Sequence, residues 1–261
     1  MKLADHRDIP KAKRIVVKVG SSSITGENSK NLDLLVEAIA KSIQNGQEVV
    51  LVTSGAIATG MPLLYFESKP TDLATSQALA SVGQSRLMAK YQASLERFDL
   101  LSGQVLLTAQ DLELEETSTN AQLAINRLLE LKVLPIVNEN DTVATAEIRF
   151  GDNDRLAALV AILVEADALI LLSDVDALYD RPPTEEGAQK IEWVEPRDDL
   201  SSIKLGGSTS AVGTGGAETK LGAARTATDA GITVILTSIG NAQEVLSGGR
   251  VGTWFQGMED N

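Results

Sequence analysis

Short apolar segments alternate with longer amphipathic segments along most of this sequence. The segment Arg14–Val19 is short, rich in β-branched residues and closed by Gly20, which is typical of a buried strand. Between Leu32 and Ile43 the apolar residues recur at helical spacing, and Asn45-Gly46 would end that helix. The same patterns predict further strands at 48–53, 104–107, 133–137, 168–172 and 232–236. They predict further helices at 72–96, 120–131, 156–164, 217–230 and 242–246.

This alternation of strands and helices predicts an α/β fold. Strand–helix–strand units cross over with a right-handed sense, so we expect a three-layer αβα sandwich with a largely parallel central sheet. A chain of 261 residues is within the range of one α/β domain. A polar Pro-Pro turn at 181–187 precedes the segment 189–194, which we expect to form an outlying hairpin strand.

Composition narrows the chemistry that this domain can perform. The formal charge of −13 argues against nonspecific nucleic-acid binding and against an anionic membrane surface. The chain has no cysteine and one histidine, His6, which excludes disulfides, thiolate nucleophiles and zinc clusters and argues against a His-based triad. Catalysis would then use Lys, Asp, backbone amides or a metal. The sequence has no apolar run of transmembrane length and no signal-peptide core, so we expect a cytoplasmic protein.

Polar residues concentrate after the predicted strand 133–137. Residues 138–154, which begin with Asn138-Glu-Asn-Asp141 and end with Gly151-Asp-Asn-Asp154, contain five carboxylates and three carboxamides. Such a loop suits a zwitterionic ligand, with carboxylates facing its ammonium and amides its carboxylate, or a hydrated Mg²⁺. Residues 152–154 also begin a predicted helix, where Asp and Asn commonly cap free amides. Capping requires neither three such residues nor the companion cluster, so we favour a ligand site.

Two strand ends carry groups that suit an anion. Lys18 lies inside a predicted strand beside Gly20 and three serines. It either snorkels from the strand end or delivers its ammonium to a phosphate that Gly20 allows the backbone to approach. Ser54-Gly55-Ala56 follows the next strand, where a plain turn is the simpler interpretation. Two such ends in one sheet strengthen the case for a shared anion site.

Two later segments have patterns that also occur in nucleotide sites. Residues 213–220 form a glycine-rich loop that places Lys220 one turn into a predicted helix, an arrangement that can cradle phosphates. The loop is neither a Walker A motif nor a dinucleotide-binding fingerprint, and taken alone it resembles a flexible linker. Ser173-Asp174 follows the strand 168–172 and could bind Mg²⁺ or a ribose, or form a turn.

In this order, the motifs resemble those of the amino-acid kinase family and, within it, the glutamate 5-kinases. The matching segments are Val17-Lys-Val-Gly-Ser-Ser22, Thr53-Ser-Gly-Ala-Ile-Ala58, 135–145, Gly151-Asp-Asn-Asp154, 173–179 and 213–220. They cover nearly the whole chain. The lysine motifs mark the wider family, whereas the pair of acidic loops marks the glutamate kinases.

The resemblance implies ATP-dependent phosphorylation of the L-glutamate γ-carboxylate to L-glutamyl 5-phosphate, the first step of proline biosynthesis, with Mg²⁺ on the ATP phosphates. It implies that Lys18 and Lys220 stabilise the transferred phosphoryl group and that Asp154 organises both lysines. It implies a glutamate site of Ser54, Asp141 and Asn153, supported by Asn138 and Asp152. It implies an ATP site of Lys18, Ser173, Asp174, Thr214, Gly215, Gly216, Ala217, Glu218, Thr219 and Lys220.

The resemblance also implies one kinase domain, with a glutamate-binding lobe at about 1–165, a nucleotide-binding lobe at about 166–261, and no C-terminal PUA domain. It implies a homodimer or homotetramer that hands its product to glutamyl-phosphate reductase. One departure is Gln122, which stands where relatives have the arginine of an Asn-Ala-Arg segment. The alternatives are another phosphotransferase of this family, or a catalytically silent regulator that could bind ligands without Lys18 and Lys220.

Overall fold

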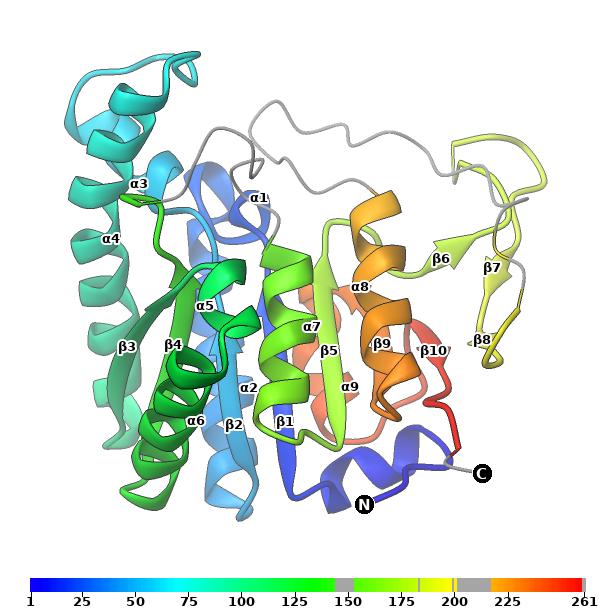
Figure 1. Cartoon of the computed structure of the whole chain (residues 1–261). Coiled ribbons are helices and arrows are strands. Elements are labelled where there is room, and N and C mark those ends of the chain that lie inside the picture. The colour runs from blue at the N-terminus through cyan, green and yellow to red at the C-terminus, as the bar shows by residue number, and fades with distance from the viewer. Residues whose placement is uncertain (144–152, 183, 199, 201–216, 260–261) are drawn as a thin grey trace.

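The computed structural model describes residues 1–143, 153–182, 184–198, 200 and 217–259. Its centre is an eight-stranded sheet with the strand order β3-β4-β2-β1-β5-β9-β10-β8 (Figure 1). The strands are β1 Arg14–Val19, β2 Glu48–Val52, β3 Leu101–Leu107, β4 Val133–Glu139, β5 Ala168–Ser173, β8 Trp193–Val194, β9 Thr233–Ser238 and β10 Thr253–Phe255. All neighbouring strands of this sheet are parallel except β9 and β10. The predicted parallel sheet is therefore confirmed.

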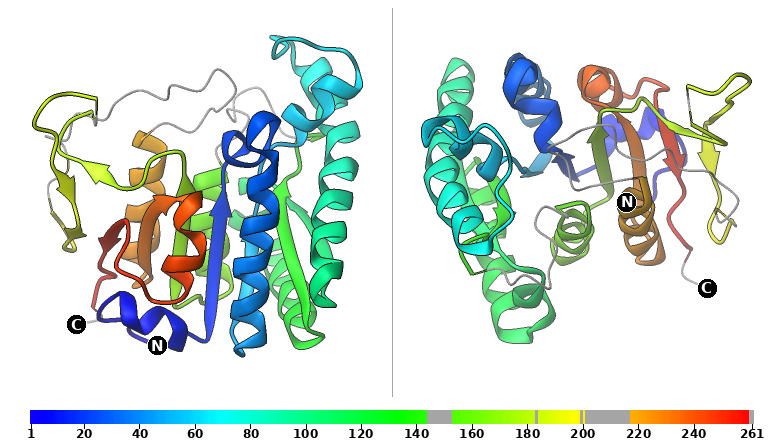
Figure 2. Two further views of the ribbon diagram at one scale, coloured as in Figure 1. Left: turned by 180° about the vertical axis from the view of Figure 1, so that it is seen from behind. Right: turned by 90° about the horizontal axis from the view of Figure 1, so that it is seen from above.

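Helices cover both faces of this sheet (Figure 2). One apolar core lies under α2 Asn31–Gln44, α4 Leu73–Leu95 and α9 Ala242–Leu246. The other core lies under α6 Glu115–Glu130, α7 Asn153–Leu163 and α8 Ala217–Asp229. Three short helices lie outside these layers, α1 Ser21–Ile24, α3 Ala56–Leu63 and α5 Ala109–Glu113, with 3-10 turns at His6–Lys11, Gly26–Lys30, Glu96–Phe98 and Ile239–Asn241. The expected three-layer αβα sandwich is confirmed.

The central strand β1 serves both cores because successive side chains of a strand point to opposite faces. Ile15, Val17 and Val19 pack in the core under α2, and Val16 packs in the core under α7. Lys18 lies two residues after Val16 on the same face of β1, so its side chain is directed toward the layer that contains α7. The position of this lysine at the end of a buried strand sets up the site described below.

The segment 189–194 was predicted to form one outlying hairpin strand, and the structure differs from this prediction. Only β7 Lys190–Ile191 forms a hairpin, with β6 Leu178–Tyr179. Trp193–Val194 instead pairs in parallel with β10 and extends the main sheet. The reason is aromatic packing, since the Trp193 and Trp254 rings stack with centroids 5.3 Å apart.

Glycine allows α3 to pack closely against α4. A Cβ atom at Gly83 of α4 would lie 1.8 Å from the Ala56 carbonyl oxygen, and one at Gly60 of α3 would lie 2.1 Å from the Leu79 carbonyl oxygen. Helix α3 is not predicted by apolar periodicity, and it contains Gly60 and Pro62, which give it weak intrinsic helix propensity. The contact with α4 supplies the stability that propensity lacks, and it fixes where α3 begins, directly after Gly55.

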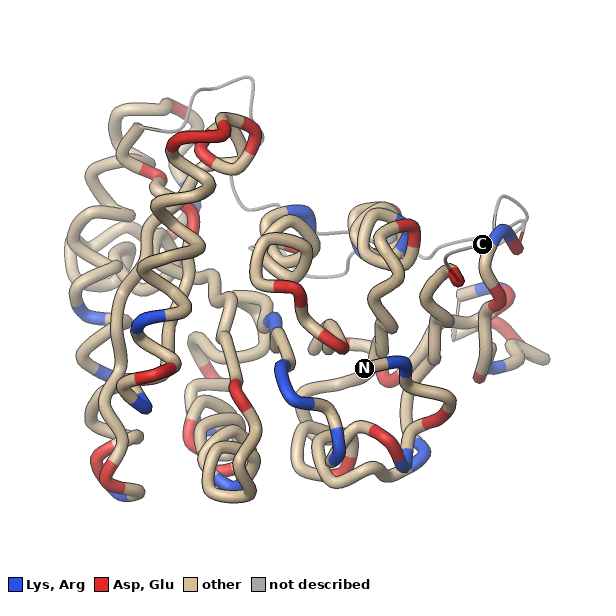
Figure 3. The backbone as a smooth tube through the Cα atoms, turned by 60° about the horizontal axis from the view of Figure 1, so that its bottom comes forward, with Lys and Arg blue, Asp and Glu red and all other residues tan. Residues whose placement is uncertain are grey.

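Most charged residues of the described chain lie on helices and loops around the sheet (Figure 3). None of the described helices combines the length and the apolar character needed to cross a membrane. Gln122, at the position of the expected arginine, donates from Nε2 to the Leu163 carbonyl at 2.5 Å. It thereby links α6 to the end of α7.

Candidate active site

Polar residues gather where the parallel strands end. Strands β1, β2, β4 and β5 are parallel neighbours around the centre of the sheet, so their carboxyl ends lie at one edge (Figure 1). The chain runs from β1 to β2 on one side and later returns to β5 on the other side of β1. Ligands of open α/β sheets bind outside the strand ends at such a reversal. The candidate residues from these ends are therefore close enough to form one site.

Two buried lysines meet one buried aspartate at this edge. The Lys18 Nζ lies 2.5 Å from Asp154 Oδ1, and the Lys220 Nζ lies 3.1 Å from Asp154 Oδ2. Lys18 comes from β1, Asp154 from the start of α7 and Lys220 from the start of α8. Lys18, Asp154 and Lys220 are only 4%, 1% and 9% exposed. Two ammonium groups share one carboxylate here, so these three side chains carry a net charge of +1, which suits an anionic ligand.

Asp154 is ionised in this setting. Burial raises the pKa of its carboxyl, but the opposing ammonium groups of Lys18 and Lys220 outweigh burial and lower that pKa to about 2. Its Oδ2 also accepts a hydrogen bond from Thr219 Oγ1 at 3.1 Å. The carboxylate thus holds both ammonium groups at fixed positions.

Two asparagines lie beside this cluster. Asn153 Nδ2 donates to the Thr53 carbonyl at 2.6 Å and to Asn138 Oδ1 at 2.7 Å. Both asparagines are 2% exposed. The Asn153 side chain therefore binds β2 and β4 rather than capping its own helix. Its Oδ1 is buried and has no hydrogen-bond partner among the described residues. A buried acceptor in that state is ready for a ligand donor.

Ser54 lies at the neighbouring strand end, at the entrance to α3. Gly55 after it has φ +104°, which disfavours any residue with a Cβ atom. The Ser54 Oγ donates a long hydrogen bond of 3.4 Å to the Val19 carbonyl. This hydrogen bond joins the ends of β1 and β2 beside the buried cluster. The Ser54 side chain is half-buried.

Asp141 lies toward α4. It lines a pocket of about 200 Å³ together with Gln84, Gln104, Glu139 and Asn140, among others. Burial and the negative charge of Glu139 raise the pKa of Asp141 to about 7, against a smaller lowering by Lys69. This carboxyl group therefore changes charge near neutral pH.

The remaining expected residues are only partly placed. Ser173, buried at the end of β5, donates from Oγ to Asp174 Oδ1 at 2.9 Å, and Asp174 and Glu218 are exposed. The backbone of Ala217 begins α8. Asp152, Thr214, Gly215 and Gly216 lie outside the described residues.

A model of the amino acid kinase family matches residues 13–238. The chain belongs to this family. Glutamate 5-kinase from Clavibacter sepedonicus is 60% identical to this amino acid kinase over 98% of both chains. Glutamate 5-kinase from Leifsonia xyli subsp. xyli is 57% identical over 98% of this chain and 95% of its own.

Solved structures show the same fold at low identity. Carbamate kinase from Giardia lamblia bound to AMP-PNP superposes with a TM-score of 0.67 at 16% identity, covering 95% of this chain and 99% of its own. UMP kinase from Bacillus anthracis gives a TM-score of 0.62 at 15% identity, covering 95% and 97%. At these identities the likeness concerns the fold of the family alone.

The described residues offer no group of three His, Cys, Asp or Glu side chains that could hold a metal ion. Both oxygens of Asp154 already face ammonium groups. A magnesium ion in this amino acid kinase would therefore fit on ligand phosphates better than on Asp154.

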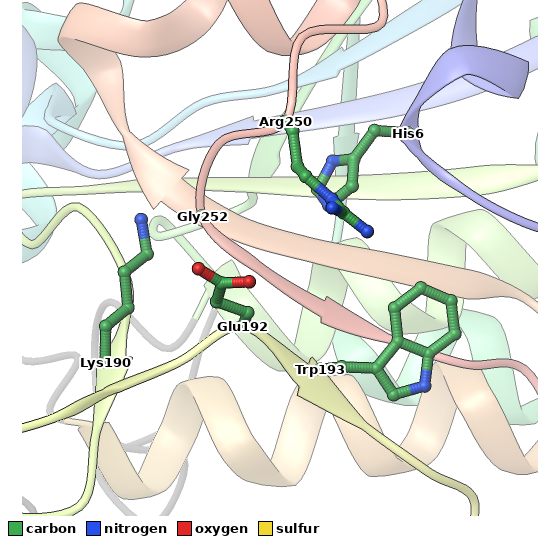
Figure 4. Close-up of a pocket in the computed structure, with 6 residues that line it drawn as sticks. All are labelled: His6, Lys190, Glu192, Trp193, Arg250 and Gly252. Carbon is green, nitrogen blue, oxygen red and sulfur yellow. The ribbon is translucent and has the colours of Figure 1, made fainter.

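His6 lies far from this chemistry. It lines a pocket of about 50 Å³ with Lys190, Glu192, Trp193, Arg250 and Gly252, which come from the segment of β7 and β8 and from the segment preceding β10 (Figure 4). The centroid of the His6 ring lies 5.0 Å from that of the Trp254 ring. Burial is the main cause that lowers the pKa of His6, and the nearby positive charge of Arg250 lowers it further. His6 therefore packs among the residues at that edge of the sheet.

Sequence reasoning missed Gln84 and Gln104. Gln84 on α4 is 9% exposed, and its Oε1 accepts from Asn138 Nδ2 at 2.8 Å. One signal was available, because Gln84 shares helical spacing with the buried Ala80, Leu87 and Tyr91. A glutamine on an otherwise apolar helix face needs a hydrogen-bond partner.

Proposed function

We propose that this amino acid kinase transfers the γ-phosphoryl group of ATP to the γ-carboxylate of L-glutamate, forming L-glutamyl 5-phosphate and ADP. The observation that carries the proposal is the Lys18–Asp154–Lys220 cluster beside a buried asparagine acceptor. Near full-length identity of 57–60% to glutamate 5-kinases supports the choice of substrate.

Phosphoryl transfer requires positive charge around the migrating group and an aligned acceptor more than it requires covalent chemistry. Two ammonium groups bound to opposite oxygens of Asp154 are held apart at fixed positions, and the cluster keeps a net positive charge. A phosphoryl group that enters between them would meet both lysines without rearrangement of the site. Preorganised charge of this kind stabilises the transition state more than it stabilises the substrates.

The acceptor needs no general base, because the γ-carboxylate of glutamate is ionised near neutral pH. A carboxylate oxygen attacks the γ-phosphorus, and the bond to the bridging oxygen breaks as ADP leaves with the electron pair. Asn153 Oδ1 and ionised Asp141 would accept hydrogen bonds from the substrate ammonium. Ser54 would bind its carboxylate, and Asn138 with Asp152 would support these contacts.

ATP would lie on the other side of the lysines. Ser173 ends β5 and Asp174 follows it, and Lys220 lies in the first turn of α8. A helix N-terminus favours phosphate because its free N–H groups and dipole face the anion. Mg²⁺ bound to the ATP phosphates would supply additional positive charge.

The proposed contacts divide along the chain. The glutamate-binding residues precede about residue 165 and the nucleotide-binding residues, apart from Lys18, follow about residue 166. We infer one kinase domain with a lobe for each substrate. We further infer a cytoplasmic homodimer or homotetramer that passes its acyl phosphate to glutamyl-phosphate reductase, because acyl phosphates hydrolyse readily in water.

The experiment that tests this function is ADP release by purified protein with ATP and Mg²⁺. The acceptor panel is L-glutamate, aspartate, N-acetylglutamate, carbamate and UMP, and hydroxylamine traps any acyl phosphate as a hydroxamate. We expect ADP and hydroxamate with L-glutamate. ADP release with another acceptor and none with glutamate would reassign the substrate. Binding of ATP without turnover of any acceptor would indicate a silent regulator.

A further inference from the structure

A line of side-chain amides connects α4 to the proposed glutamate site. Gln104 Oε1 on β3 accepts from Gln84 Nε2 at 3.1 Å, and Gln84 Oε1 accepts from Asn138 Nδ2 at 2.8 Å. Asn138 Oδ1 in turn accepts from Asn153 Nδ2 at 2.7 Å. Gln84 and Asn138 each donate to one neighbour and accept from another, whereas Gln104 only accepts and Asn153 only donates along this line. The reversal of any member would place two donors or two acceptors against each other.

Backbone groups fix the sense of this line where it reaches the strand ends. The Thr53 carbonyl can only accept, and it receives Asn153 Nδ2 at 2.6 Å. The Glu139 N–H can only donate, and it binds Asn138 Oδ1 at 2.9 Å. The Asn138 amide nitrogen has its partner in Gln84, whose Oε1 accepts from Asn138 Nδ2. At the other end of the line, Asn153 Oδ1 is buried without a described partner.

We propose that Gln84 is a positioning residue for the substrate ammonium: through Asn138 it holds the Asn153 carboxamide with Oδ1 presented as an acceptor. The inference rests on the glutamate kinase activity proposed above. Gln84 itself does not need to contact the substrate. Without its Oε1, the buried Asn138 Nδ2 would lack a partner and Asn138 would turn to find one, which withdraws the acceptor of Asn153 Nδ2.

The orientation of the Asn153 carboxamide matters because its oxygen and its nitrogen interact differently with an ammonium group. A carboxamide oxygen accepts a hydrogen bond from an ammonium group, whereas a carboxamide nitrogen would place its own N–H against it. The line of amides therefore favours a phosphoryl-acceptor substrate that places an ammonium group near Asn153. A dicarboxylate without that group, such as glutarate, gains nothing from it.

The test compares Gln84→Met and Gln84→Asn with the wild type. Methionine keeps the side-chain length without polar atoms, and asparagine keeps the amide but is one methylene shorter. We expect either variant to raise KM for L-glutamate about tenfold while KM for ATP stays within about twofold. The inhibition constant of glutarate should change by less than about twofold in the same variants.

Two further variants separate positioning from stability. Gln84→Glu keeps an acceptor for Asn138 and should stay within about threefold of the wild-type KM for glutamate. Gln92→Met is the matched control, because Gln92 also links α4 to β3, accepting from the Ser102 N–H at 2.9 Å, away from Asn138. It should lower the melting temperature without changing KM for glutamate.

An unchanged KM for glutamate in both Gln84→Met and Gln84→Asn would overturn the inference, as would equal losses of glutamate and glutarate affinity. A tenfold rise in Gln84→Glu would do the same. These results leave the proposed function standing if the wild type phosphorylates glutamate. If the wild type does not phosphorylate glutamate, the function fails and this inference fails with it.

Discussion

Lys18 on β1 and Asp154 on α7 form a buried ion pair with 2.5 Å between Nζ and Oδ1. The pair joins the central strand to the helix that covers it, and Lys220 adds a second ammonium on the other carboxylate oxygen. Removal of the shared carboxylate would take this counter-charge away from two buried ammonium groups at once.

We therefore predict that Asp154→Asn lowers the free energy of unfolding by about 3–5 kcal/mol, the usual cost of breaking a buried ion pair on one side. Urea denaturation measures this change. The matched control is Glu130→Gln, which breaks the exposed pair between Arg127 Nη1 and Glu130 Oε2 at 2.7 Å and should cost less than about 1 kcal/mol. Equal denaturation midpoints for Asp154→Asn and wild type would contradict the account of the cluster.

A second prediction concerns pH. Because the pKa of Asp141 is raised to about 7, this carboxyl is neutral in acid and ionised above that value. If ionised Asp141 accepts from the glutamate ammonium, kcat/KM for glutamate at saturating ATP should rise with pH through about 7 and then level off. At saturating ATP, the pH profile of kcat/KM for glutamate reports the pKa of groups in the enzyme–ATP complex, the form that binds glutamate.

Glu139→Gln provides the specific check on that profile. The negative charge of Glu139 is the second cause of the raised pKa of Asp141, after burial. Its removal should move the inflection in kcat/KM to lower pH, whereas the exposed Glu130→Gln should leave it in place. An inflection that does not move in Glu139→Gln would assign the titration to another group.

A third prediction tests the helix contact that positions Ser54. Gly83→Ala would place a Cβ 1.8 Å from the Ala56 carbonyl oxygen, so α3 must shift and Ser54 with it. We expect a destabilisation of about 1–3 kcal/mol and a higher KM for glutamate. The control Gly222→Ala has open space around its Cβ inside α8 and should stabilise by about 0.5–1 kcal/mol. Equal melting temperatures for Gly83→Ala and wild type would contradict close packing here.

The regular parts of the fold were predictable from the sequence because local pattern determines them. β-branched runs predicted β1 and β2, and alternation along β1 directs Lys18 to the face opposite Val17 and Val19. The long helix α4 was predicted at 72–96 and spans Leu73–Leu95. The two strands follow from the apolar runs of their own segments.

Other features depend on tertiary contacts and had no local signal. α3 exists because Gly60 and Gly83 permit a close approach, which neither segment reveals alone. The segment 189–194 divides between two sheets because Trp193 finds Trp254 at a distant position in the chain. The spacing of Lys18, Asp154 and Lys220 in the sequence does not show that their side chains lie together. The roles assigned to them remain predictions.

The central claim is that the two lysines act on the migrating phosphoryl group. The most direct measurement is glutamate-dependent kcat of Lys220→Ala, with the exposed Lys41→Ala as a control. If Lys220 meets charge that develops in the transition state, its removal should lower kcat by roughly 10²-fold or more, and Lys41→Ala should leave it unchanged. A Lys220→Ala protein that turns over at the wild-type rate would contradict the account.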